Sequence, residues 1–177
     1  VTTICSTPEE ISAAFENARR FSRHVIVERF LAGRDYRVLV TGNKVAAASW
    51  RRPPSVTGDG RSTIRQLVEQ ENANPARGAG HTNILTKIPL DELAVQIARK
   101  QGFELDDVPP PGLCIELRGN ANLSTGGTAE DVTDELPELT RQLCIRAART
   151  IGLDVAGIDI ICQDISKPLA AQGGGVI

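Results

Sequence analysis

A single carboxylate, that of Asp159, interrupts the otherwise apolar run VAGIDII at residues 155–161. Burying an unpaired carboxylate is costly, so such a residue must be paired, bind a cation or lie at an exposed edge. Side chains alternate along a strand, which puts Gly157 on the same face as Asp159 and leaves room there for a ligand. We interpret Asp159 as a Mg²⁺ ligand that bridges to phosphate, with an exposed aspartate of an edge strand as the alternative.

A second concentration of charge lies in residues 25–40, VIVERFLAGRDYRVLV. Apolar residues alternate at both ends of this segment, which predicts two strands joined by a glycine-containing turn. A solvated hairpin turn is the simplest explanation of the charges between them, because loops are normally polar. A binding site is the alternative. The charged residues in question are Glu28, Arg29, Arg34, Asp35 and Arg37.

A third polar segment, residues 118–128, combines Arg118, Asn122 and Ser124 with the pair Gly126-Gly127. Charged, amide and hydroxyl groups beside two permissive glycines are suited to wrapping an anion with backbone N–H groups. A plain polar loop is the alternative, since glycine-rich matches alone are weak signals.

The segment of residues 72–89 has no clear period and is rich in Asn, Gly and Pro. A loop of this length inside a compact domain is usually functional when it is ordered. Its His81 either stabilises the loop or folds over the site and contacts phosphate.

Composition narrows the class of protein. The 177 residues are 41% hydrophobic and 24% charged with a net charge of −2, which is ordinary for a globular protein and gives no reason to expect nucleic acid as a partner. No run is long enough to span a membrane and no signal peptide begins the chain, so we expect a cytoplasmic protein without a membrane partner. The four separated cysteines suggest small buried hydrophobic residues rather than a zinc site or a disulfide scaffold.

The elements that must position these residues mix helices and strands without strict alternation. Several strands follow one another through hairpins, which favours an α+β fold with an antiparallel sheet and helices packed on it. In the last helix, an apolar row at four-residue spacing predicts the buried face: Leu139, Leu143, Ala147 and Ile151. Helices are expected from residue 8, after residue 62, from residue 91 and over 138–151, and strands within 25–40 and over 45–50, 113–117 and 155–161.

Together these segments resemble those of the ATP-grasp ligases. The stretch VIVERFLAGRDYR resembles the hinge between the two lobes of that family, where adenine is sandwiched, and IGLDVAGIDII resembles the strand that carries the first Mg²⁺-binding carboxylate, here Asp159. The resemblance implies ATP and Mg²⁺ as cofactors, with Asp35 holding the ribose. It also implies that the adenine edge pairs with the backbone of the hinge, whose residues here are Glu28, Arg29, Phe30 and Leu31.

The stretch NLSTGGTAEDVTDE and the long insert before it narrow the resemblance to cyanophycin synthetases and, somewhat less, to the ligase half of bifunctional glutathione synthetases. The implied reaction transfers the γ-phosphoryl group of ATP to a carboxylate and joins the resulting acyl phosphate to an amine. Arg37 and Arg118 would contact phosphate or substrate carboxylate, and Asn122 and Ser124 the acyl phosphate or the substrate backbone. Aspartate and a growing poly-aspartate chain are the implied substrates; glutathione synthesis and a non-catalytic nucleotide-binding module are alternatives.

The resemblance covers the whole chain and implies an ATP-grasp domain that is truncated at both ends. Residues 1–31 would be the end of the small nucleotide-binding lobe and the hinge, and residues 32–177 an incomplete large lobe. Other parts of the family's triphosphate and metal sites would lie outside this stretch, so we expect the isolated chain to have little or no activity. An unpaired strand at residues 175–177 is an expected edge for self-association, and hence for a homo-oligomer.

Overall fold

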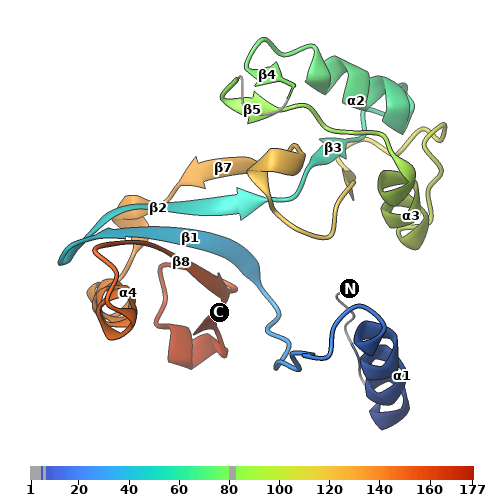
Figure 1. Cartoon of the computed structure of the whole chain (residues 1–177). Helices are drawn as coiled ribbons and strands as arrows, with labels where there is room; N and C mark the ends of the chain where they lie inside the picture. Colours follow the sequence, from blue (N-terminus) through green and yellow to red (C-terminus); the bar gives the residue numbers. More distant parts are fainter. Residues whose placement is uncertain (1–4, 6, 80–82) are drawn as a thin grey trace. The chain divides into compact units, whose positions relative to one another are not determined.

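The computed structural model describes Cys5, residues 7–79 and residues 83–177. The chain divides into two compact units, Val1–Ala32 and Gly33–Ile177 (Figure 1). Among the described residues, no helix is both long enough and apolar enough to cross a membrane. His81 lies outside the described residues.

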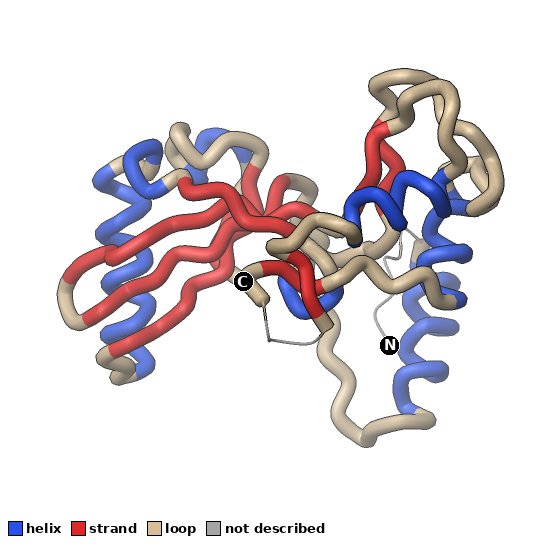
Figure 2. Tube along the Cα trace, turned by 90° about the horizontal axis from the view of Figure 1, so that it is seen from above, coloured by secondary structure: helices blue, strands red, loops and turns tan. Residues whose placement is uncertain are grey.

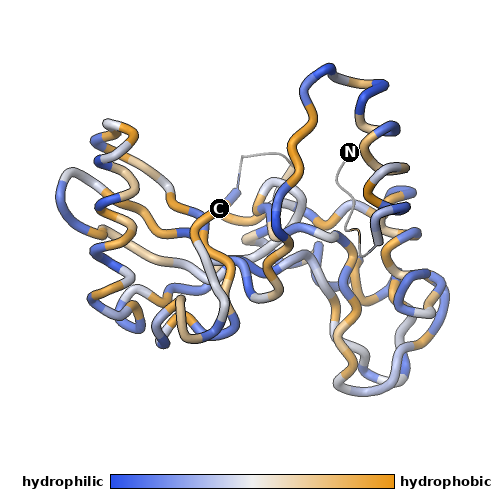
Figure 3. The backbone as a smooth tube through the Cα atoms, turned by 90° about the horizontal axis from the view of Figure 1, so that it is seen from below, coloured by the Kyte–Doolittle hydropathy of each residue, from blue (hydrophilic) through white to orange (hydrophobic). Residues whose placement is uncertain are grey.

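The helix of the first unit, as far as its residues are described, is α1 (Pro8–Arg19). It begins at residue 8, as predicted: Thr7 and Glu10 form a capping box, in which each side chain accepts a hydrogen bond from the backbone N–H of the other, and Pro8 takes the first helical position. The helix carries both apolar and polar residues, and none of them is buried within this unit (Figure 3).

The segment that follows α1, residues 24–32, forms no strand. The strand expected from the alternation at Val25 and Val27 is therefore wrong: a strand needs a hydrogen-bonded neighbour, and the described ladders pair no residue before Arg34. Two apolar side chains of this segment are largely exposed, Ile26 by 80% and Val27 by 69%. The charged residues before the first strand thus lie in an irregular connection rather than in a hairpin turn.

The second unit is built on a five-stranded sheet with the order β7-β2-β1-β8-β9, in which every neighbouring pair is antiparallel. This confirms the predicted α+β class with an antiparallel sheet. The edge expected at residues 175–177 is the short strand β9, which pairs with β8 alone. The strands are β1 (Arg34–Thr41), β2 (Lys44–Arg52), β7 (Thr128–Asp131), β8 (Val155–Cys162) and β9 (Gly175–Val176).

Helix α4 (Glu138–Ile151) covers one face of this sheet (Figures 1 and 2). The predicted buried row is wrong at its ends, because Leu139 is 74% and Ile151 73% exposed. A helix turns by about 100° per residue, so a four-residue row drifts by about 40° at each step and winds away from the sheet. The residues that α4 buries instead are Thr140, Cys144, Ile145 and Ala148.

The core between α4 and the sheet follows the alternation of the two central strands. Tyr36 and Val38 of β1 and Ile158 and Ile160 of β8 point toward α4 and are buried. Their neighbours in sequence therefore point to the opposite face, which presents the polar residues of β1 and β8.

Two of the four cysteines behave as predicted. Cys144 and Cys162 are buried in this core, and burial raises the pKa of each thiol to about 11, so both stay protonated. Cys5 is half-buried, whereas Cys114 is exposed on the strand of residues 114–116, whose middle residue Ile115 is buried instead, so the prediction of burial is wrong for Cys114.

The rest of the second unit has a core of its own, formed by Ile64, Val68, Ile115, Leu117 and their neighbours. Helix α2 begins one residue later than expected, with a capping box between Thr63 and Gln66. The elements here are β3 (Ser55–Thr57), α2 (Ile64–Asn72), β4 (Arg77–Gly78), β5 (Leu85–Thr86), α3 (Glu92–Lys100) and β6 (Cys114–Glu116). The described part of the unit also contains the 3-10 turns η1 (Leu123–Thr125), η2 (Thr133–Glu135) and η3 (Leu169–Gln172).

Candidate functional site

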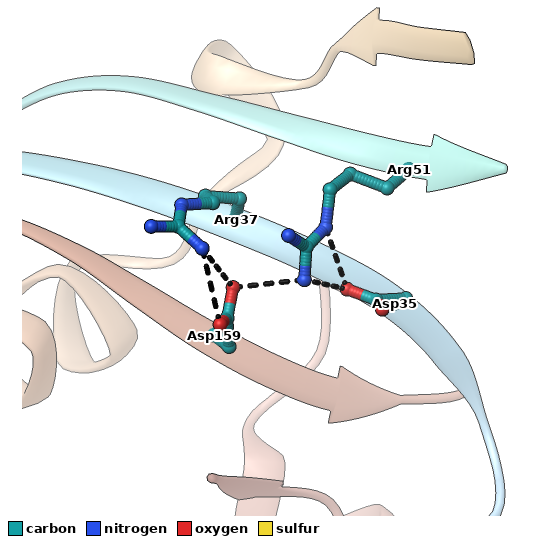
Figure 4. A network of polar contacts seen from close by, with 4 residues as sticks. All are labelled: Asp35, Arg37, Arg51 and Asp159. Carbon is teal, nitrogen blue, oxygen red and sulfur yellow. Dashed lines mark hydrogen bonds and ion pairs between the residues drawn. The ribbon is translucent and has the colours of Figure 1, made fainter. Parts of the chain in front are cut away.

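Four charged side chains meet on the face of the sheet opposite to α4 (Figure 4). Asp35 and Arg37 come from β1, Arg51 from β2 and Asp159 from β8. The antiparallel register sets Asp35 opposite Arg51 and Arg37 opposite Asp159, so strand pairing alone brings together residues more than a hundred positions apart. We call these four residues the charge network.

Arg51 links the two carboxylates of the charge network. Its Nη2 donates to Asp35 Oδ1 at 2.6 Å and to Asp159 Oδ1 at 2.8 Å, and its Nε donates to Asp35 Oδ1 at 2.9 Å. The Arg51 side chain is only 14% exposed, against 28% for Asp35 and 30% for Asp159. Arg51 is not among the residues singled out from the sequence.

Arg37 makes the second, more exposed contact with Asp159. Its Nη1 donates to both carboxylate oxygens, at 3.1 and 3.2 Å, and its side chain remains 48% exposed. Asp159 therefore is a half-buried, fully paired carboxylate, neither an isolated buried charge nor a solvated edge residue. The structure brings together three residues singled out from the sequence: Asp35, Arg37 and Asp159.

Gly157 makes room for the guanidinium group of Arg37. A Cβ atom at Gly157 would lie 2.5 Å from both Nε and Nη2 of Arg37, too close for the present side-chain position. The space that the sequence suggested for a ligand is thus filled by Arg37.

Gly157→Ala is expected to push the Arg37 guanidinium away from Asp159 while leaving the fold intact, because the clash falls on the end of a flexible side chain. The displaced guanidinium group would also be held away from the place where Arg37 is expected to contact phosphate, so nucleotide affinity should fall by about tenfold, the value of one lost charge-assisted contact. Titration calorimetry on the single variants and on the double variant with Arg37→Ala checks this. In a protein that already carries Arg37→Ala, Gly157→Ala should have no further effect on nucleotide affinity. An equal loss of nucleotide affinity on Gly157→Ala with and without Arg37→Ala would contradict the expectation.

Arg118 lies away from the charge network and is buried. Its Nη2 donates to Asp91 Oδ2 and its Nη1 to the Leu117 carbonyl, both at 2.8 Å, and the side chain is 4% exposed. The other oxygen of Asp91 caps α3 by accepting from the Ala94 N–H. In this structure Arg118 anchors the start of α3.

Asn122 and Ser124, at the 3-10 turn η1, expose their side chains to solvent. The backbone amides of the adjacent glycine pair are occupied: Gly126 N–H donates to the Leu123 carbonyl and Gly127 N–H to the Asn122 carbonyl. The anion-binding nest expected from these glycines is therefore not formed here, and polar side chains are what this turn offers to a ligand.

The hinge residues Glu28, Arg29, Phe30 and Leu31 belong to the first unit, where they lie in the irregular segment after α1. Phe30 is 61% exposed, as expected for a side chain without a core around it. Only the last residue of the predicted nucleotide site, Asp35, is part of the sheet.

The chemistry of Asp159 fits a hard divalent cation, which prefers carboxylate oxygens. Among the described residues, however, no group of three or more His, Cys, Asp or Glu could hold a metal ion. Mg²⁺ commonly takes one or two carboxylates together with substrate phosphates and water. The charge network therefore fits a cation that arrives with a phosphate-bearing ligand, and does not fit one that is held by protein alone.

A cavity of about 490 Å³ lies elsewhere, beside β2 and η2. No residue of the charge network lines it. Its walls are Ala46, Ala47, Asp131, Val132, Thr133, Asp134 and Glu135.

Comparison with known proteins gives the family. The model of the RimK-like ATP-grasp domain matches residues 116–169. The chain is 50% identical over 169 residues to a cyanophycin synthetase from Trichormus variabilis and 47% identical over 171 residues to one from Synechocystis, in each case over 96% of this chain. The chain spans only about a fifth of the length of these relatives.

A solved structure gives the same result. The crystal structure of a bifunctional glutathione synthetase from Pasteurella multocida superimposes with a TM-score of 0.69 and 36% identity, covering 90% of this chain and 21% of that one. The sequence resemblance and the predicted fold are thereby confirmed: the chain belongs to the ATP-grasp family.

Proposed function

We propose that this chain forms part of the ATP site of a carboxylate–amine ligase that works through an acyl phosphate. The observation that carries the proposal is the charge network, in which Asp159, a carboxylate suited to Mg²⁺, stands beside Asp35 and two arginines on one face of the sheet. Phosphoryl transfer from ATP requires groups that bind the cation, the sugar and the phosphates. In the charge network, carboxylates are suited to the cation and the sugar, and guanidinium groups are suited to the phosphates.

In the proposed reaction, the γ-phosphoryl group of ATP moves to a substrate carboxylate and ADP leaves. An amine then attacks the acyl carbon, an amide bond forms and phosphate departs with the bonding electrons. A bound Mg²⁺ would neutralise charge on the phosphate oxygens. Asp159 would hold that ion, and Arg37, the more exposed arginine, would leave Asp159 to contact the phosphoryl group.

The remaining roles are proposals of the same kind. We assign the adenine edge to the backbone of Glu28, Arg29, Phe30 and Leu31, and the ribose hydroxyls to Asp35. The exposed side chains of Asn122 and Ser124 suit the acyl phosphate or the substrate backbone. Arg118 would contact substrate only after its ion pair with Asp91 opened, and we assign His81, which lies outside the described residues, to phosphate.

For the substrates, we propose synthesis of the cyanophycin type, with aspartate as the amine and the end of a growing poly-aspartate chain as the carboxylate. The support is the higher identity to cyanophycin synthetases, 50% against 36% for the bifunctional glutathione synthetase. We further propose that the isolated chain turns over little or not at all, because it spans only about a fifth of the length of the cyanophycin synthetases that it matches.

Release of ADP by the full-length protein tests the substrates. ADP should appear with ATP, Mg²⁺, aspartate, arginine and a polymer primer, and should not appear when the primer is omitted. Release only with γ-glutamylcysteine and glycine would replace this assignment by glutathione synthesis. If the protein binds nucleotide but releases ADP with neither set of substrates, the protein would be a non-catalytic nucleotide-binding module.

A further inference from the structure

We propose that Arg51 is a positioning residue that holds the carboxylates of Asp35 and Asp159 at a fixed separation. The ribose of the nucleotide and its cation would then be bound at a fixed distance from each other. This inference rests on the proposed function, because it assumes that those carboxylates serve the nucleotide and its metal ion. No group of Arg51 needs to touch the reacting atoms.

The contacts single out Arg51 from the other arginine of the network. Its Nη2 is shared between the two carboxylates, at 2.6 Å from Asp35 Oδ1 and 2.8 Å from Asp159 Oδ1. Without a cation between them, two carboxylates on neighbouring strands would repel each other and turn apart. Arg51 is the least exposed member of the network, at 14%, so it is also the least free to leave.

The two oxygens of Asp159 are held differently. Oδ1 accepts from both arginines, whereas among the described contacts Oδ2 accepts only from Arg37, whose side chain is 48% exposed. Movement of Arg37 would therefore free Oδ2 for a cation while Arg51 kept Oδ1, and with it the plane of the carboxylate, in place. Arg51 thus acts on the metal through the ligand it orients.

The guanidinium group is essential to this role. Nε and Nη2 of Arg51 are fixed in one plane and reach both carboxylates from a single side chain. A lysine has the same charge on a single nitrogen without a planar fork. Arg51→Lys therefore keeps the charge and removes the bridge, which makes it the sharper test than alanine.

The test is titration of the full-length protein with Mn²⁺ at saturating ATP, with free Mn²⁺ measured by electron paramagnetic resonance. Arg51→Lys should weaken the apparent Mn²⁺ affinity by about 10-fold to 100-fold, the usual effect of losing a partner that orients a metal ligand. The matched control is Arg52→Lys, since Arg52 is the next residue of β2, pairs with Glu130 and packs over Trp50 on the opposite face. The control should bind Mn²⁺ as the wild type does.

The outcomes separate this inference from the proposed function. Loss of Mn²⁺ affinity in Asp159→Asn but not in Arg51→Lys would overturn the role of Arg51 alone. Equal Mn²⁺ affinity of wild type and Asp159→Asn would overturn the proposed function.

A second variant covers the case in which Arg51→Lys does not fold. Asp35→Asn keeps Arg51 but releases it from Asp35, so Arg51 is left to pair with Asp159 alone. The apparent Mn²⁺ affinity should then fall although Asp35 is no metal ligand, and an unchanged affinity would overturn the inference.

Discussion

Asp159→Asn is expected to lower kcat/KM for ATP in the full-length protein by about 10³-fold, or roughly 4 kcal/mol of transition-state stabilisation. The amide that replaces the carboxylate is neutral and a weak ligand for Mg²⁺. Arg37 and Arg51 would also lose the partner that orients them. Coupled measurement of ADP release, at Mg²⁺ concentrations up to saturation of the wild type, checks the expectation.

The matched control for this substitution is Asp154→Asn. Asp154 precedes β8 and is exposed, five positions from Asp159 and outside the charge network. The same chemical change there should leave kcat/KM unaltered. Unchanged turnover in Asp159→Asn would show that this carboxylate binds no metal in the reaction.

Arg77→Ala is expected to lower the free energy of unfolding of the second unit by about 3 kcal/mol. The Arg77 side chain is 2% exposed and pairs with Glu71 through Nε and Nη2, at 3.1 and 2.9 Å. Its Nη1 donates to the carbonyls of Thr86 and Gly126, at 2.7 and 3.0 Å. Replacing Arg77 by alanine takes away the hydrogen bonds that Arg77 donates to the Glu71 carboxylate and to the two carbonyl groups. Arg77 then no longer connects α2, β5 and the glycine pair.

Urea denaturation followed by circular dichroism at 222 nm measures this effect. The control is Arg65→Ala on helix α2, the helix that also carries Glu71, the partner of Arg77; Arg65 forms an exposed ion pair with Asp106. Exposed pairs contribute little, so its midpoint should stay close to that of the wild type. Equal midpoints for Arg77→Ala and the wild type would mean that water replaces the lost contacts without cost.

The residue that the sequence did not reveal, Arg51, illustrates the limit of reading strand pairs from spacing. Next to the turn between β1 and β2, Val40 pairs with Val45. If every further residue of β1 paired with the next one of β2 in the same way, Trp50 would lie opposite Asp35. A bulge between Leu39 and Val40 shifts the register by one residue, which puts Arg51 there instead. Because one step in register exchanges the two faces of a strand, the place of Arg51 in the network could not be predicted without the bulge.

Local signals were more reliable than distant ones. The start of α1 at residue 8 and the alternation along β8 depend on residues close in sequence, and both predictions are confirmed. The expected strand at Val25 fails because a ladder needs a partner that local alternation cannot supply. The glycine pair at Gly126 and Gly127 fails as an anion site for a related reason: the sequence does not show that carbonyls of the same turn already occupy its amides.

The composition of the charge network also bears on how a ligand reaches it. Two guanidinium groups stand against two carboxylates, so their fields largely cancel beyond the sheet surface. A polyanion diffusing through solution is therefore neither drawn in nor turned away by these four groups at long range. Its capture should depend on short-range contacts, and the part of the association rate that these groups govern should respond only weakly to added salt.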